Sequence, residues 1–188
     1  MKNKLLLFLL LLSPLVINSQ EKLNIDITKS SIKWIGELSF RFGGHDGYIN
    51  FKQGYFIKNG DVITGGEFIV DMNSITNTDI KEKVGKDNLV DHLKKSDFFD
   101  VKKYPIATLK ITSVEYFENN GARFYANMTI KGITKPIQFY SKLDYKNKTM
   151  KTRFKIDRQE WNINYQSKFK NSFISDAIGF DVTIQLQP

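Results

Sequence analysis

The sequence predicts an all-β protein: an antiparallel barrel of about eight strands, with a short helical insert between two blocks of strands. Apolar and polar residues alternate with a period of two in nine short segments after Gln20. Tight-turn signals separate several of these segments, among them Asn59-Gly60 and Asn119-Asn120-Gly121. One stretch, 79–99, breaks the alternation and divides the chain into the two blocks.

The first block has four segments, and each has one apolar side. The residues predicted to face inward are Leu23, Ile25 and Ile27; Ile32, Trp34, Gly36, Leu38, Phe40 and Phe42; Ile49, Phe51, Tyr55 and Ile57; and Val62, Thr64, Gly66, Phe68, Val70 and Met72. Charged residues such as Lys33 and Glu67 alternate with them, which is typical of strands with one buried face.

The second block continues the pattern over five segments. Its predicted inward residues are Leu109, Ile111 and Ser113; Phe124, Ala126, Met128 and Ile130; Ile137, Phe139, Ser141, Leu143 and Tyr145; Met150, Thr152, Phe154 and Ile156; and Ile178, Phe180, Val182, Ile184 and Leu186. A closed barrel is favoured over a sandwich because closure leaves no exposed edge strand.

The inward faces mix large and small residues. The small ones are Gly36, Thr64, Gly66, Ser113, Ala126, Ser141 and Thr152. This mixture favours a barrel that encloses a cavity, because each void in a solid core would cost about 1 kcal/mol or more. The alternative stays open that the small residues only fit the taper of a filled barrel.

The irregular stretch predicts a helix followed by an aromatic plug. Asp87 is the expected N-cap of a helix over 88–95, whose apolar face carries Leu89 and Leu93. The pair Phe98-Phe99 then follows in a polar setting. It could cover a barrel mouth as a lid or simply seal one end of the core, and one position could do both.

The N-terminus resembles a signal segment. Lys2 and Lys4 precede an apolar run over 5–12, and cleavage is expected near Ser19–Gln20. The predicted division is therefore a signal peptide over 1–19 and one domain over 20–188, with a periplasmic or secreted location. The chain has no cysteine, which excludes disulfides, thiolate catalysis and a lipid-modified cysteine anchor.

Residues that could carry catalysis are sparse. The two histidines, His45 and His92, lie far apart and in no metal-binding spacing. The carboxylates of Asp157 and Glu160 are interpreted as a turn feature. We therefore expect no enzyme activity, no catalytic residue, no metal and no cofactor. The alternative is an enzyme acting on a bound lipid head group through His45, Asp91 and His92.

The chain is basic, with 28 Lys and Arg against 20 Asp and Glu and a formal net charge of +8. This excess does not by itself indicate nucleic-acid binding. A set of basic residues lies on the outer face predicted for the seventh and eighth strands: Lys142, Lys146, Lys148, Lys151, Arg153 and Lys155. An ordinary solvated face is the favoured interpretation, and transient contact with an anionic membrane or an acidic partner is the alternative.

Several motifs together resemble the YceI-like family. The central one is Asp91-His92-Leu93, followed by 96–100 and Tyr104-Pro105. Further matches in the same order are 43–47, 65–66 with 71–75, 129–136 and 156–158. They lie mainly in turns and in the insert, and together they span essentially the whole mature chain.

The resemblance implies an exported, lipocalin-like antiparallel barrel with a long hydrophobic lumen. The family is associated with polyisoprenoids, isoprenoid quinones and related amphiphiles, and has no agreed catalytic activity. The expected function is therefore a carrier of a polyprenyl phosphate, an isoprenoid quinone or a similar lipid, and the alternative is an envelope stress or partner-binding protein. Monomer and homodimer both stay open, and the resemblance tilts towards the homodimer.

The residues expected to contact the ligand follow from the face assignments and the plug. They are Trp34, Leu38, Phe40, Phe51, Phe68, Phe98, Phe99, Phe124, Met128, Phe139, Phe154, Trp161 and Phe180.

Overall fold

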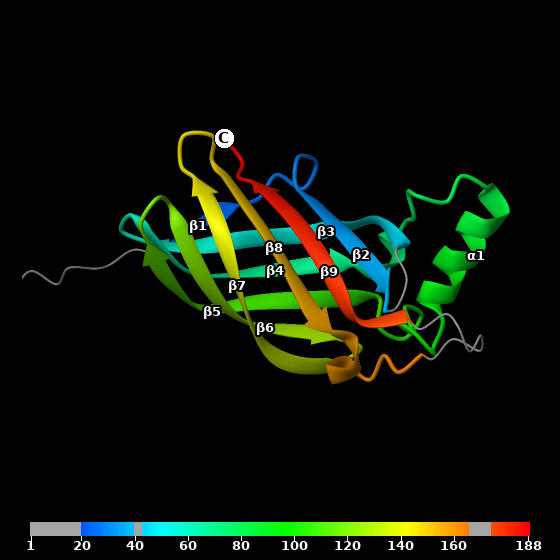
Figure 1. Cartoon of the computed structure of the whole chain (residues 1–188). Helices are drawn as coiled ribbons and strands as arrows, with labels where there is room; N and C mark the ends of the chain where they lie inside the picture. The colour runs from blue at the N-terminus through cyan, green and yellow to red at the C-terminus, as the bar shows by residue number, and fades with distance from the viewer. Residues whose placement is uncertain (1–19, 40–42, 166–173) are drawn as a thin grey trace, which may run out of the picture.

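The structure, a computed structural model, describes residues 20–39, 43–165 and 174–188. The predicted signal segment 1–19 lies outside the described residues, as do Phe40 and Phe42. The described chain forms a closed antiparallel barrel of eight strands with one extra strand, and its one α-helix lies beside one end of the barrel (Figure 1). The predicted barrel is confirmed.

The strands and helices follow one another along the chain in the predicted order. They are β1 (Gln20–Asn24), β2 (Ser31–Leu38), β3 (Gly44–Asn59), β4 (Val62–Asp71), the 3-10 helix η1 (Met72–Ser74), α1 (Lys83–Lys94), β5 (Ile106–Phe117), β6 (Gly121–Ile130), β7 (Ile133–Asp144), β8 (Thr149–Asp157), the 3-10 helix η2 (Arg158–Trp161) and β9 (Ile174–Gln185).

The barrel closes because its longest strand pairs on both edges. The sheet runs β3-β2-β9-β8-β7-β6-β5-β4, and β4 returns to pair with β3. On its other edge, β3 pairs first with β2 and then, over residues 55–59, with β1. The extra strand β1 therefore continues the barrel wall beyond the end of β2, and Ile25 links it to Leu186 after β9 by an isolated bridge.

One seam of the barrel is much shorter than its neighbours. β6 and β7 pair from Gly121↔Lys142 to Ile130↔Ile133. β7 and β8 pair only from Ser141↔Thr152 to Asp144↔Thr149. The rest of β7 therefore has no backbone ladder with β8.

Bulges change the predicted side-chain orientation in three places. The register shifts between Phe51 and Gln53, so that Phe56 is 1% exposed and the predicted inward residues Tyr55 and Ile57 are not buried. A bulge adds one residue to a strand, and a shift of one residue moves the following side chains to the opposite face. The prediction for Tyr55 and Ile57 was therefore wrong.

Bulges also place two of the small residues on the outer face, although the sequence predicted them to face inward. Thr64 lies at the register shift between Ile57 and Lys58, and Ser113 follows the shift after Ile111. Both side chains are exposed, so the prediction that they contribute to the interior was wrong.

The helix begins earlier than predicted. α1 starts at Lys83, and Glu82 is its N-cap residue without a side-chain hydrogen bond to the helix. Asp87 is not the N-cap; it lies inside the helix and pairs with Lys83 one turn before it. Since no Ser, Thr, Asp or Asn caps this helix, the usual start signal is missing from the sequence.

Candidate functional site

The barrel encloses an apolar cavity of about 210 Å³. All eight barrel strands contribute to its wall, and Leu89 and Leu93 of α1 contribute at the end next to the helix. We call this cavity the lumen. It supports the interpretation of the small inward residues as space for a ligand, since Gly36 and Thr152 both line it.

The structure brings most of the predicted binding residues together around the lumen. Ten of them line it: Trp34, Leu38, Phe51, Phe68, Phe98, Phe99, Met128, Phe139, Phe154 and Phe180. Phe40 lies outside the described residues.

Two predicted residues, Phe124 and Trp161, do not line the lumen but pack against residues that do. Phe124 is fully buried, and its ring stacks on that of Phe139 with centroids 5.5 Å apart. Trp161 is 2% exposed, and its Nε1 donates a hydrogen bond to the carbonyl oxygen of Met128 at 3.2 Å. Both therefore support residues of the lining rather than facing the lumen.

The aromatic prediction overlooked aliphatic residues of the lining. These include Ile32, Ile49, Val70, Ile111, Met150, Ile178, Val182 and Ile184. They lie on the same inward faces as the aromatic residues, so the alternation itself was the signal that could have found them.

The Phe98-Phe99 plug sits at the α1 end of the lumen. Its backbone is held in a tight turn: the Phe99 N–H donates to Leu93 O at 3.1 Å, and the Asp100 N–H donates to Lys95 O at 2.8 Å. The two rings contact each other edge to face with centroids 4.9 Å apart, and both line the lumen. Phe98 is 6% exposed, so it closes this end of the core and also forms part of the cavity wall.

His92 lies beside the plug and also lines the lumen. Its ring packs edge to face on Tyr165 with centroids 4.4 Å apart, and its Nδ1 lies 3.9 Å from Asp97 Oδ2. Its Nε2 is buried and finds no hydrogen-bond partner among the described residues. This atom is therefore available to a polar group of a ligand at this end of the lumen.

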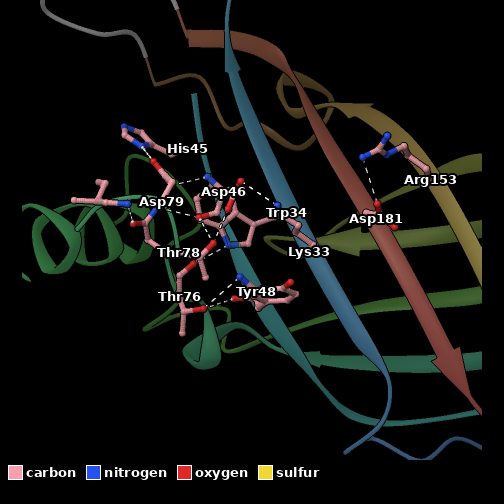
Figure 2. A network of polar contacts seen from close by, with 12 residues as sticks. Lys33, Trp34, His45, Asp46, Tyr48, Thr76, Thr78, Asp79, Arg153 and Asp181 are labelled. Carbon is pink, nitrogen blue, oxygen red and sulfur yellow. Dashed lines mark hydrogen bonds and ion pairs between the residues drawn. The ribbon is translucent and has the colours of Figure 1, made fainter. Parts of the chain in front are cut away.

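His45 belongs to a different polar cluster, shown in Figure 2. Its Nδ1 lies 2.8 Å from Asp79 Oδ2, and the backbone N–H of Asp46 donates to Asp79 Oδ1 at 2.9 Å. The carboxylate of Asp46 in turn accepts hydrogen bonds from Thr78 Oγ1 at 2.5 Å and pairs with Lys33 Nζ at 3.0 Å. The cluster fixes the segment after η1 against the start of β3.

Two carboxyl groups of this cluster have shifted pKa values. Hydrogen bonding from Thr78 and then from Lys33 lowers the pKa of Asp46 below its ordinary value. Burial alone would raise the pKa of Asp79, but the hydrogen bonds from the Asp46 N–H, from His45 and from Asn77 outweigh it and lower that pKa. Both groups are therefore ionised at neutral pH.

Trp34 and Gly47 complete the attachment of this segment to the barrel. The Trp34 indole N–H donates to the carbonyl oxygen of Thr76 at 2.9 Å (Figure 2). A side chain at Gly47 would place its Cβ only 1.9 Å from that same oxygen. The close approach of the two backbones therefore requires glycine at position 47, and it holds Trp34 in place against the lumen.

Arg158 is a buried charge in the wall at the same end. It is 3% exposed; its Nη2 pairs with Asp176 Oδ1 at 2.8 Å, and its Nη1 donates to the carbonyl oxygen of Ile163. The neighbouring Asp157 accepts a hydrogen bond from the Gln159 N–H at 2.9 Å, which caps η2. Asp157 thus has the turn role predicted for it, and Arg158 joins η2 to the start of β9.

The two histidines do not form one constellation with Asp91. Each lies beside a carboxylate of its own, Asp79 for His45 and Asp97 for His92. No group of three His, Asp or Glu side chains within residues 20–39, 43–165 and 174–188 is placed to hold a metal ion. Across the same ranges, none of the helices has the length and hydrophobicity needed to span a bilayer.

The chain is similar to known proteins in both sequence and fold. A family model described as the YceI-like domain matches residues 23–187. Curated "UPF0312" proteins of two Pseudomonas putida strains are 42% identical over 48 residues, which is 26% of this chain and 25% of each relative. The chain thus matches about a quarter of the length of these relatives.

Solved structures show the same fold. The crystal structure of Burkholderia cenocepacia BcnA superposes with a TM-score of 0.71 at 17% identity, covering 85% of this chain and 98% of that chain. The YceI protein of Campylobacter jejuni superposes with a TM-score of 0.56 at 20% identity, covering 74% of this chain and 84% of that chain.

Proposed function

The chain belongs to the YceI-like family, and from this premise we propose that it is an exported carrier of a long-chain isoprenoid or a similar amphiphilic lipid. The observation that carries the proposal is the lumen, whose wall is almost wholly apolar and is built by all eight barrel strands. Such a wall can shelter a hydrocarbon chain from water and needs no covalent chemistry to hold it.

The energetics of burial are sufficient for a carrier. Each buried methylene group contributes about 0.8 kcal/mol, so a few isoprene units supply on the order of 10 kcal/mol before the costs of association and ordering. Micromolar to nanomolar binding corresponds to about −8 to −12 kcal/mol, so several isoprene units must be buried to exceed those costs. An apolar sleeve of this kind therefore needs only a few polar contacts to orient its ligand.

Those polar contacts are expected at the α1 end. The buried Nε2 of His92 is one candidate, since it lines the lumen and lacks a partner among the described residues. His45 also lines the lumen and lies next to Asp79. We therefore propose that the head group of the lipid lies near α1 and that its tail runs into the barrel.

Native mass spectrometry of the mature protein, purified from its own cell envelope, tests the proposal. The expected result is a bound mass that is released by organic extraction and identified as an isoprenoid or another long-chain amphiphile. A ligand-free mass that stays unchanged on incubation with polyprenyl phosphates and isoprenoid quinones would contradict it.

A pair of neighbouring substitutions gives the matched control. Ala107 lines the lumen, whereas Ile106, the preceding residue, is 42% exposed. Ala107→Trp should fill the lumen and lower the bound fraction at least about tenfold, because the tail would lose several methylene contacts. Ile106→Trp should leave the bound fraction unchanged. Equal binding by both variants would place the ligand outside the lumen.

A further inference from the structure

A second cavity of about 410 Å³ lies at the end of the barrel opposite α1. The β3–β4 turn, the β7–β8 turn and the C-terminal residues surround it. Phe56, Leu143 and Leu186 contribute apolar groups to its floor, and charged residues such as Lys22 and Lys148 lie at its rim. We call it the distal pocket.

Two residues line both the lumen and the distal pocket: Met150 and Ile184. They are directly opposite each other on β8 and β9, so their side chains stand side by side on the inner face. Met150 is 5% exposed and Ile184 is 3% exposed. These two side chains therefore form a shared wall between the cavities.

The sizes of the two cavities indicate why a ligand would need to pass this wall. The lumen, at about 210 Å³, is smaller than the roughly 300–1,000 Å³ of pockets that hold drug-sized ligands. A long hydrocarbon chain therefore needs additional volume, and the distal pocket lies directly beyond the wall. Methionine has three rotatable bonds and adapts readily to its surroundings, so Met150 can turn aside with little loss of packing.

We propose that the distal pocket is the second compartment of one binding site and receives the far end of a long isoprenoid or acyl tail that passes between Met150 and Ile184. This inference rests on the proposed carrier function and adds that the mode of binding depends on the length of the tail. Tails that end in the lumen bind without the wall moving, whereas longer tails bind with Met150 displaced.

The rim of the distal pocket favours an apolar occupant over an anionic one. Lys58 pairs with Glu21 at 3.3 Å, and the Nζ of Lys22 lies 4.1 Å from the centre of the Tyr55 ring. Two of its lysines are thus engaged in contacts within the protein. The apolar floor, in contrast, is continuous with the wall that the lumen shares.

The test compares the affinities of geranyl, farnesyl, geranylgeranyl and octaprenyl phosphate for three forms of the protein. In the wild-type protein, the dissociation constant should fall at least about tenfold from farnesyl to geranylgeranyl phosphate, as expected when further methylene groups are buried. Met150→Phe should reduce this gain, measured as the ratio of the farnesyl and geranylgeranyl phosphate dissociation constants within the same variant, to below about threefold. Met128→Phe is the matched control, since Met128 lines the lumen alone, and it should weaken short and long chains alike.

A second measurement does not depend on the folding of Met150→Phe. The chain has no cysteine of its own, so Gln187→Cys places a single label for an environment-sensitive fluorophore at the distal pocket. Its emission should change with octaprenyl phosphate and stay constant with geranyl phosphate.

The outcomes separate the two proposals. If short chains bind, the gains with length are equal in wild type and Met150→Phe, and the label does not respond to octaprenyl phosphate, the second compartment is refuted and the carrier function stands. A label that responds equally to geranyl phosphate would indicate an independent site and also refute the compartment. Failure of every probe to bind the wild-type protein would overturn the carrier function and the inference that rests on it.

Discussion

Phe139 and Phe154 stack on each other across the seam between β7 and β8, with ring centroids 5.0 Å apart and an angle of 21° between the rings. The backbone ladder of this seam has already ended at Ser141↔Thr152. Phe139 also stacks on Phe124 at 5.5 Å, and Phe154 contacts Phe180 with tilted rings at 5.3 Å. Side chains therefore hold the barrel wall together at a point where backbone hydrogen bonds do not.

Phe139→Ala should lower the free energy of unfolding by about 3–5 kcal/mol, because it removes a buried ring from this row and leaves a cavity. Gln138→Ala is the control on the same strand, with its side chain exposed on the opposite face; its change should stay within about 0.5 kcal/mol. Urea unfolding of both variants measures the difference. A loss below about 1 kcal/mol for Phe139→Ala would show that the seam does not depend on the stack.

Gly47→Ala should destabilise the protein by more than about 2 kcal/mol, since the new Cβ would overlap the backbone of Thr76 and separate it from β3. Gly65→Ala provides a matched control in the barrel wall, because a Cβ there meets its nearest neighbour at an ordinary 3.5 Å. Thermal unfolding compares the two. Equal midpoints would mean that the backbone of Thr76 can move away from position 47 with little loss of stability.

The two tryptophans should report ligand binding differently. Trp34 lines the lumen, and Trp161 stands behind the lining. In Trp161→Phe, the remaining emission from Trp34 should shift when a polyprenyl phosphate is added. In Trp34→Phe, the emission from Trp161 should change much less. The substitution of Trp34 also removes its hydrogen bond to Thr76 and should cost about 1 kcal/mol. A larger response from Trp161 would place the ligand outside the lumen.

Acid should weaken the protein through the cluster around Asp79. The pKa values of Asp46 and Asp79 lie below their ordinary value of 3.8 in the folded protein. The folded state therefore binds these protons less readily than the unfolded state. The stability that the two carboxylates contribute is present above pH 3.8 and is lost as the pH falls through their folded values.

The double variant Asp46→Asn, Asp79→Asn should be less stable at neutral pH and should lose less stability than wild type between neutral pH and acid. Unfolding by urea at a series of pH values measures, for each protein, the slope of the free energy of unfolding against pH. Part of the slope should remain, because hydrogen bonding from Thr28 also lowers the pKa of Asp26. Parallel slopes in the two proteins would show that the cluster does not contribute to acid sensitivity.

The sequence predicted the barrel because alternation is a property of each strand taken alone. It could not predict the bulges, since no residue type around the extra residue in β5, which exposes Ser113, marks its position. Long-range packing decides where such a residue is accommodated. The early start of α1 was missed for a related reason: Glu82 provides no side-chain cap, so the helix depends on tertiary contacts rather than on a local signal.

The cavity could be predicted in outline but not in its limits. Inward aromatic residues such as Phe51 and Phe180 follow from the period of two, and both line the lumen. The exclusion of Phe124 depends on how far along the barrel each strand is staggered, which no single strand encodes. The distal pocket has the same origin, because turns distant in sequence meet only when the barrel is closed.

The short ladder between β7 and β8 has a consequence for how the protein behaves at high concentration. Lys142 and Lys151 lie directly opposite each other within that ladder, and like charges in this position repel. Local opening should therefore begin there and turn two interior strands into free edges that can pair with another chain. A barrel usually protects against aggregation by having no edge, and here that protection depends on one short row of backbone bonds and on the phenylalanine rings beside it.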